Sequence, residues 1–135
     1  MKETQQENQL LSQYNQQERE SLANMVMRVL NEWNIRDEFQ LQLLGLPTNT
    51  PQRELTKFSR GKALPDDDDL LARAVHLIGI NQALSIIFPL NPKMPGFWLT
   101  MRNRHFRSQP LTIMLEEGLA GMDRIWCHLD CTHNW

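Results

Sequence analysis

Apolar residues recur every three or four positions along most of the chain, which is the period of a helix with one buried face. The first such stripe follows Ser21, a residue suited to cap a helix, and ends at Asn34. Its members are Leu22, Met25, Val26, Val29, Leu30 and Trp33. The pattern predicts a helix between Ser21 and Asn34.

Residues 1–20 are polar and rich in Gln, Asn and Glu. This composition predicts a mobile leader or a frayed helix. The alternative is a segment that adds a strand or a helix to a partner protein.

Two short helices are expected next, because each has a recognisable start and end. Asp37 is placed to cap the first, and Gly45 ends it. Thr50 is placed to cap the second, Pro51 takes its first position, and Gly61 ends it. The residues between Gly45 and Thr50 form a tight polar turn.

A longer apolar stripe from Leu70 to Phe88 predicts a buried helix that Pro89 ends. Gly79 lies within it and permits a break or close packing of a neighbour. The aspartates Asp66–Asp69 precede it, as expected where the first N–H groups of a helix are unpaired. A metal site is the alternative, although consecutive helical residues point in different directions.

Three further helices are predicted in the last part of the chain, beginning near Asn91, at Pro110 and after Gly118. No stretch alternates apolar and polar residues with β-branched enrichment, so no strand is expected. The predicted fold class is all-α, a compact helical protein with an N-terminal helix-turn-helix and a C-terminal helical domain.

Composition narrows the class of protein. A chain of 135 residues with a formal net charge of -2 is not a polycation, so DNA binding requires a local basic patch. Two cysteines make no disulfide framework, and a reducing cytoplasm is the expected location. No signal peptide is recognisable and no window approaches the roughly 20 apolar residues of a membrane span, so no membrane association is expected.

A local basic patch lies in the second short helix, where residues 48–62 carry a net charge of +3. Polar side chains on the face away from Leu55 and Phe58 suit contacts with phosphates and base edges. These DNA-contact candidates are Thr50, Gln52, Arg53, Thr56, Lys57 and Arg60. A helical hairpin with a solvated basic face is the alternative.

Aromatic and arginine side chains, which are common anchors of protein interfaces, gather between Trp98 and Pro110. The interface candidates are Trp98, Arg102, Asn103, Arg104 and Phe106, with Arg107 beside them. The alternative is that Trp98 and Phe106 are core residues that fix a long loop, which still leaves the arginines outward.

Cysteine and histidine are suited to zinc, and Cys127, His128, Cys131 and His133 lie close together. The usual C-x2-C spacing is missing, so surface thiols are the alternative, and no metal or other cofactor is expected. Cys127 and His128 are adjacent and do not face each other on a helix.

No catalytic motif is recognisable, neither a Gly-rich phosphate loop nor a G-x-S-x-G turn. The histidines are scattered along the sequence, and no acid/base pair stands out. They are His76, His105, His128 and His133. A binding protein without a small-molecule substrate is therefore expected, and not an enzyme.

Several sequence pieces between Leu70 and Asp130 occur in a characteristic order and spacing. They are Leu77–Leu84, Phe88-Pro89, Gly96–Leu99, Arg102–Phe106, Pro110–Leu115, Gly118–Met122 and Leu129-Asp130. This stretch resembles the toxin-binding domain of the Xre/MbcA/ParS antitoxins, and residues 21–62 resemble the Xre-like helix-turn-helix that precedes it. The resemblance divides the chain into a leader (1–20), a helix-turn-helix region (21–64), a toxin-binding domain (65–130) and a tail (131–135).

Two places depart from the family pattern. The family usually has a proline before the loop asparagine, where Arg102 stands, and glycine after the loop phenylalanine, where Arg107 and Ser108 stand. Because glycine accepts positive φ, its loss predicts a different loop conformation.

The resemblance implies an antitoxin that forms homodimers or larger oligomers, binds operator DNA and inhibits a cognate toxin through its C-terminal domain. Such toxins are often RES-domain proteins that consume NAD or transfer ADP-ribose, and the antitoxin covers their substrate pocket. The terminal Trp135, with its free carboxylate, suits a nucleotide pocket by stacking and by pairing with arginine, and is a further toxin-contact candidate.

Two other functions remain open at this point. One is a stand-alone helix-turn-helix transcriptional regulator without a toxin partner. The other is a metal-responsive adaptor that uses Cys127 and Cys131.

Overall fold

The computed structural model describes residues 14–133 as seven α-helices, which cover 69% of these residues, and no strand. The helices are α2 (Gln16–Glu32), α3 (Asp37–Leu44), α4 (Gln52–Ser59), α5 (Asp68–Ile87), α6 (Met94–Thr100), α7 (Pro110–Glu117) and α8 (Leu119–His133). An isolated bridge between Asn103 and Ser108 is the one β feature in this part of the chain. The expectation of an all-α protein is confirmed.

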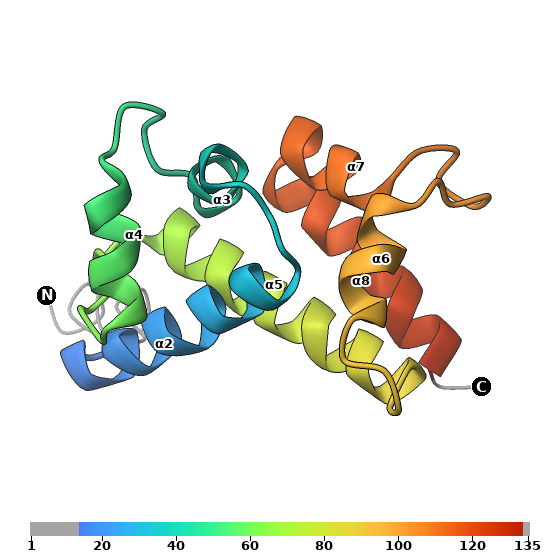
Figure 1. The fold of residues 1–135 in the computed structure, drawn as a ribbon, viewed down its shortest axis with the longest axis horizontal. Coiled ribbons are helices and arrows are strands. Elements are labelled where there is room, and N and C mark those ends of the chain that lie inside the picture. Colours follow the sequence, from blue (N-terminus) through green and yellow to red (C-terminus); the bar gives the residue numbers. More distant parts are fainter. Residues whose placement is uncertain (1–13, 134–135) are drawn as a thin grey trace, which may run out of the picture.

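Helix α5 lies at the centre of the molecule and contacts helices on both sides (Figure 1). The helices α2, α3 and α4 lie toward one end, and α6, α7 and α8 lie toward the other. The most extensive contacts of α5 are with α8 and α2. The buried apolar side chains form one cluster that extends from Ala23 in α2 to Leu129 in α8.

A close helix contact in this core is made at Gly79. Helix α5 continues unbroken through this residue, and a Cβ atom there would lie 2.1 Å from Cζ2 of Trp126 on α8. The absence of a side chain therefore lets the indole ring of Trp126 approach the backbone of α5. Of the two expectations for Gly79, close packing is correct and a helix break is wrong.

Helix α2 begins earlier than its apolar stripe predicts. Asn15 is the N-cap, because its Oδ1 accepts the N–H of Glu18 at 2.8 Å, while Oε1 of Glu18 accepts the N–H of Asn15 at 3.0 Å. This reciprocal pair satisfies N–H groups that the first turn leaves unpaired. The predicted cap at Ser21 is wrong, and residues 16–20 belong to α2; residues 1–13 lie outside the described part of the chain.

The short helices α3 and α4 are present, but their first turns differ from the prediction. Asp37 is the first residue of α3 and not its cap, and Pro51 directly precedes α4 in place of Thr50. No side chain caps either N-terminus by a hydrogen bond. The ends are as predicted, because Gly45 follows α3 with φ 76° and Gly61 follows α4 with φ 98°, left-handed values that suit glycine.

The acidic run before α5 is a helix start. Oδ1 of Asp67 accepts the N–H of Leu70 at 2.9 Å, which makes Asp67 the N-cap. Asp68 and Asp69 are in the first turn, where the partial positive charge of the helix dipole favours carboxylates.

The expectation that no window approaches the apolar length of a membrane span requires correction, while the expected lack of membrane association stays a prediction. By length and composition alone, α5 is long and apolar enough to cross a membrane, with a mean hydropathy of 1.5. The stripe reaches this value because it is apolar on more than one face, as a helix packed against several neighbours requires. In the fold, 44% of this window is buried inside the protein.

Candidate functional site

The outward face of α4 carries the predicted DNA-contact residues. Leu55 and Phe58 are buried, so the polar residues around them turn toward solvent. Gln52, Arg53, Thr56, Lys57 and Arg60 are exposed, and Thr50 is half-buried. The predicted orientation of α4 is therefore correct, while contact with DNA stays a prediction.

Ion pairs reduce the positive charge available on this face. Glu54 lies 3.2 Å from Nζ of Lys57 and 2.8 Å from Nζ of Lys62. Hydrogen bonds from Lys62 and then from Lys57 hold the pKa of Glu54 below its ordinary value. Arg53 and Arg60 form no ion pair with another described residue, so these two arginines are the side chains best placed for phosphate groups.

The connection between α3 and α4 is longer than expected. It spans residues 45–51, whereas helix-turn-helix motifs usually have a turn of about three or four residues. The two helices contact each other and lie at the same end of the molecule (Figure 1). The order of elements fits a helix-turn-helix, but the turn between them is not tight.

Asn103 organises the loop between α6 and α7. Its Oδ1 accepts the N–H of His105 at 2.8 Å and that of Phe106 at 3.3 Å. Its backbone N–H donates to the carbonyl of Ser108 at 2.9 Å, and its carbonyl accepts the N–H of Arg107 at 2.7 Å. Both the side chain and the backbone of Asn103 therefore hold the shape of the loop.

Arg107 changes the expectation about this loop. Its φ is 57°, which lies in the left-handed region that glycine adopts most readily. Arg107 therefore takes the left-handed conformation without being glycine, and a difference from the loop of the family stays a prediction. The hydrogen bonds through Asn103 hold a conformation that costs a non-glycine residue about 1–2 kcal/mol.

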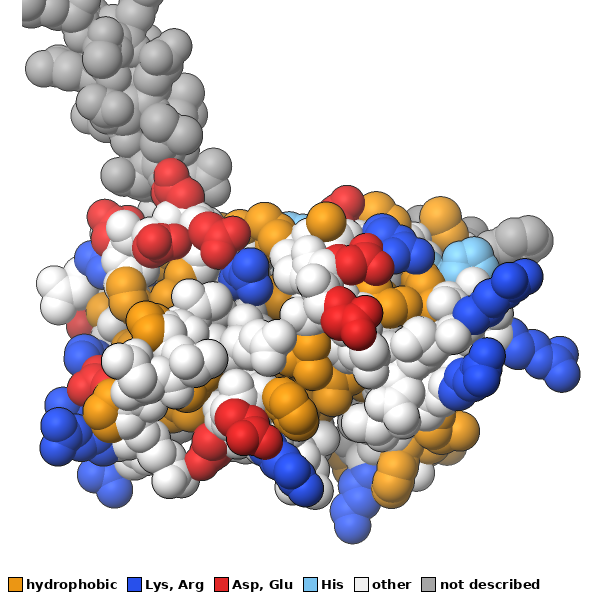
Figure 2. All heavy atoms as spheres, turned by 90° about the horizontal axis from the view of Figure 1, so that it is seen from above, with side chains coloured by type: hydrophobic (Ala, Val, Ile, Leu, Met, Phe, Trp, Pro, Cys, Tyr) orange, Lys and Arg blue, Asp and Glu red, His pale blue; other side chains and the backbone are white. Residues whose placement is uncertain are grey.

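The predicted interface residues of this loop separate into two groups. Trp98 and Phe106 are half-buried and pack against the core. Arg102, Arg104 and Arg107 are exposed and form no ion pair within residues 14–133. Basic side chains gather at the end of the molecule that carries this loop (Figure 2). The aromatic rings thus fix the loop, and the arginines face outward.

Two apolar side chains at the same end were not predicted to be exposed. Phe97 and Met101 are 54% and 58% exposed, although α6 buries Pro95 and Leu99. The sequence indicated this exposure. Phe97, Trp98, Leu99 and Met101 lie in or directly after a helix of two turns, so their side chains cannot all face the core.

A second group of residues lines an open hollow of about 550 Å³ between the α6–α7 loop and α8. Its walls are His105, Phe106, Asp123, Arg124, Cys127, His128 and Cys131. The rings of His105 and His128 are stacked, with centroids 4.3 Å apart. These two histidines are far apart in the sequence but lie together in the folded protein. Burial, and then the charge of His105, lower the pKa of His128.

Cys127 and Cys131 are exposed free thiols in this hollow, one helical turn apart on α8. Among the side chains that the structure describes, no group of three His, Cys, Asp or Glu residues could hold a metal ion. The side chain of His133 and the predicted toxin-contact residue Trp135 lie outside the described residues. The predicted tail is helical as far as His133, the last residue of α8.

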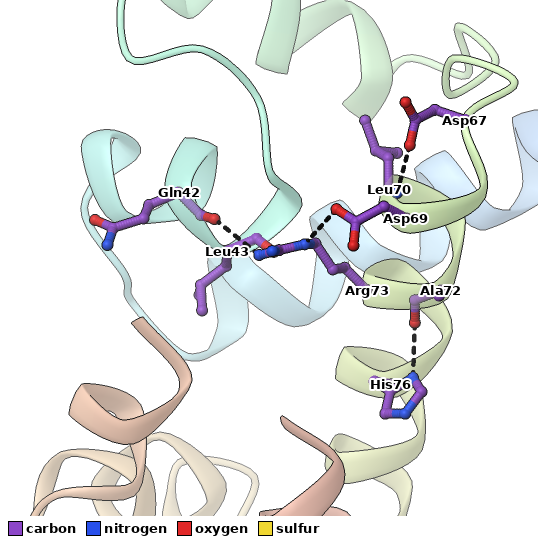
Figure 3. Close-up of polar contacts among 8 residues, drawn as sticks. All are labelled: Gln42, Leu43, Asp67, Asp69, Leu70, Ala72, Arg73 and His76. Carbon is purple, nitrogen blue, oxygen red and sulfur yellow. Dashed lines mark hydrogen bonds and ion pairs between the residues drawn. The ribbon is translucent and has the colours of Figure 1, made fainter. Parts of the chain in front are cut away.

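Arg73 of α5 points toward the carbonyls of Gln42 and Leu43 at the C-terminal end of α3 (Figure 3). Its Nε donates to Oδ2 of Asp69 at 2.8 Å, and its Nη1 lies 3.4 Å from the carbonyls of Gln42 and Leu43, at the C-terminal end of α3. A Cβ atom on Gly118, between α7 and α8, would lie 2.9 Å from Nη2 of Arg73. The guanidinium group therefore joins α5 to the end of α3 and lies beside Gly118, between α7 and α8.

No protein-family model matches the chain, and no curated protein matches it.

Proposed function

We propose that this protein is the antitoxin of a type II toxin–antitoxin system. It binds a RES-like toxin that consumes NAD or transfers ADP-ribose, and it covers the substrate pocket of that toxin. It also represses its own operon by binding operator DNA as a homodimer. It is a binding protein and acts without a cofactor.

The observation that supports toxin binding best is the α6–α7 loop. This loop presents Arg102, Arg104 and Arg107 to solvent without ion pairs in the described chain, on a turn that Asn103 holds in shape. A loop backbone that is already ordered loses little conformational entropy on binding, and unpaired arginines form strong bidentate contacts with carboxylates. The loop lies in the segment that resembles a toxin-binding domain.

The contribution of Trp135 to inhibition is a separate part of the proposal. An indole ring is able to stack on a base in a nucleotide pocket. Removing residues 131–135 should therefore weaken inhibition more than it weakens binding, because the arginine loop remains.

The proposed operator contact uses the exposed face of α4. Arg53 and Arg60 reach phosphate groups, and Gln52 and Thr56 on the same helix suit base edges. Each phosphate contact releases counterions, so the affinity for operator DNA should fall steeply as the salt concentration rises.

Two matched pairs of charge reversals test the two activities together. Arg102→Glu with Arg104→Glu alters the loop, and Arg53→Glu with Arg60→Glu alters α4; all four arginines are exposed. Each variant is measured for co-purification with the protein encoded next to this chain and for binding to the DNA upstream of its own gene. The loop pair should lose the protein partner and keep DNA binding, and the α4 pair should do the reverse.

The second candidate function is a stand-alone transcriptional regulator. The exposed polar face of α4 favours it, since that face needs no toxin to explain it. If wild-type protein binds DNA through Arg53 and Arg60 but no neighbouring gene product co-purifies with it, this second function replaces the antitoxin.

A further inference from the structure

Two histidines join the α6–α7 loop to α8. The rings of His105 on the loop and His128 on α8 are stacked, with centroids 4.3 Å apart and an angle of 21° between their planes. The ring of Phe106 lies edge-on to both, with centroids 4.8 Å from His105 and 5.0 Å from His128. This cluster of three rings therefore holds the loop against α8.

The ring cluster is accessible to protons from solvent. It forms part of the wall of the open hollow on α8, where His105 is exposed and His128 is half-buried. Cys127 and Cys131 lie in the same wall, and a protonated thiol is neutral. Histidine changes its charge between pH 5 and pH 8, because its ordinary pKa is about 6.5. The two imidazole rings are therefore the groups of this contact that gain charge on mild acidification.

Basic groups are close to the ring cluster. On the loop, Arg104 precedes His105 and Arg107 follows Phe106. On α8, Cζ of Arg124 lies 5.8 Å from the centre of the Phe106 ring. A proton on each histidine would therefore place two like charges in one stack, beside a third positive group.

The acidic groups near the hollow have basic neighbours of their own. Glu117 of α7 forms an ion pair with Arg124 of α8 at 2.7 Å. Asp123 of α8 lies 3.5 Å from Nε2 of His76 on α5. These two carboxylates are thus engaged with other side chains, while the two stacked imidazole rings face each other.

We propose that the α6–α7 loop docks on α8 while the stacked pair of His105 and His128 carries at most one proton, and that the loop is released when both rings are protonated. Two imidazolium rings at this separation repel each other, whereas a pair with at most one charge stacks without that repulsion. Release also removes the packing that helps to hold Arg107 in its left-handed conformation. The consequence for the partner rests on the proposed function: a released loop must be ordered again before its arginines bind the toxin, so acid weakens the complex.

The dependence on pH has a definite sign. Burial, and then the charge of His105, hold the pKa of His128 in the docked protein below its ordinary value. The released loop therefore binds more protons, so docking is fully favoured above the ordinary value and is weakened as the pH falls below it. One excluded proton lowers the docking constant by at most about tenfold for each pH unit.

Amide exchange of this chain alone tests the release. The N–H groups of His105 and Phe106 donate to Oδ1 of Asn103, and that of Arg107 donates to its carbonyl. Protection factors correct for the pH dependence of the exchange chemistry itself. For these three amides they should fall by about three- to tenfold between pH 7.5 and pH 5.5, while the circular dichroism of the helices stays unchanged.

Substitutions assign the effect to the two rings. His105→Phe with His128→Phe keeps two rings but removes both protonation sites, so loop protection should be equal at the two pH values. If this double variant does not fold, His105→Gln at an exposed position gives the same test, because only one charge can then form. His76→Gln removes a histidine outside the stack and is the control, which should keep the wild-type fall. Equal protection of the wild-type loop at both pH values, or the same fall in the double variant, would overturn the inference.

The affinity for the protein encoded next to this chain is the second readout. Between pH 7.5 and pH 5.5 it should fall several-fold more for wild-type protein than for the double variant, since protons that act on the partner affect both alike. Equal losses would overturn the link between the loop and its partner and leave the antitoxin function standing. If no partner binds wild-type protein at pH 7.5, the antitoxin proposal fails, and the exchange measurement still decides whether the loop is released.

Discussion

At Gly79, a single hydrogen in place of a side chain decides how α5 and α8 pack. Gly79→Ala would place Cβ 2.1 Å from the Trp126 ring, so one of the two helices must move. Overpacking of this kind costs about 1–3 kcal/mol, and we expect a loss of that size in the free energy of unfolding, measured by urea denaturation. Ser85→Ala, on an exposed position of the same helix, is the control and should change stability by less than about 0.5 kcal/mol.

Combining Gly79→Ala with Trp126→Phe provides the decisive check on this contact. The smaller ring removes the atom that the new Cβ would meet, so the double variant should be more stable than the sum of the two single losses predicts. Strict additivity would show that the two residues do not interact.

His128 makes stability depend on pH. Burial, and then the charge of His105, hold its pKa in the folded protein below the ordinary value of about 6.5. The unfolded chain therefore binds more protons as the pH falls below that value, and the contribution of His128 to stability, present above it, is lost with acidification. His128→Phe keeps an aromatic ring beside His105 and Phe106, and its melting temperature should fall less between pH 7.5 and pH 5.5 than that of wild-type protein.

The α6–α7 loop is the element whose shape depends most on one side chain. Asn103→Ala removes the acceptor for the N–H groups of His105 and Phe106, which is worth about 1 kcal/mol for each hydrogen bond. We expect the amides of residues 103–108 to exchange several times faster with deuterium, while the exchange of α5 stays unchanged. Asn103→Asp keeps an acceptor oxygen and should restore protection; exchange as fast as in the alanine variant would mean that the side chain does not hold the loop.

The helices were predictable from the sequence because each buries apolar residues at helical spacing, and Gly45, Pro89 and Pro110 limit them by local chemistry. The start of α2 was missed, although Asn15 and Glu18 have the spacing of a capping box. Residues 16–20 are all polar, so the apolar stripe begins later than the helix does.

The parts of the candidate site that depend on distant residues were not predictable from local pattern. The outward position of Arg102 and Arg104 was expected from their polarity. The stack of His105 on His128 joins residues on different elements, and a groove beside Phe97 forms only when α2 and α6 pack together. The sequence period identifies the buried face of a helix, but it does not show which exposed apolar residue lies beside a cavity.

At the scale of the whole molecule, the two predicted regions share one core. Helix α5 packs against both α2 and α8, and Gln42 of α3 donates to the carbonyl of Leu115 in α7 at 3.0 Å. We therefore expect a single cooperative unfolding transition, with coincident curves from circular dichroism and tryptophan fluorescence. Two separate transitions would show that residues 21–64 and 65–130 fold independently.

Arg73 is expected to contribute to this cooperativity. Arg73→Ala removes the hydrogen bonds of the guanidinium group to the carbonyls of Gln42 and Leu43 and to Asp69, and should cost about 1–2 kcal/mol, with faster amide exchange in α3. Arg124→Ala, which breaks an exposed ion pair with Glu117, is the control and should cost less than about 1 kcal/mol. Equal losses in the two variants would show that Arg73 does not hold α3 in place.

The most direct test of the antitoxin function is NAD consumption by the protein encoded next to this chain, measured while this chain is added in increasing amounts. We expect NAD loss to fall as a complex forms and to be suppressed at saturation. Arg102→Glu with Arg104→Glu should restore NAD loss, whereas Arg53→Glu with Arg60→Glu should not. NAD loss that continues unchanged at saturating concentrations of wild-type protein would contradict the function proposed for this molecule.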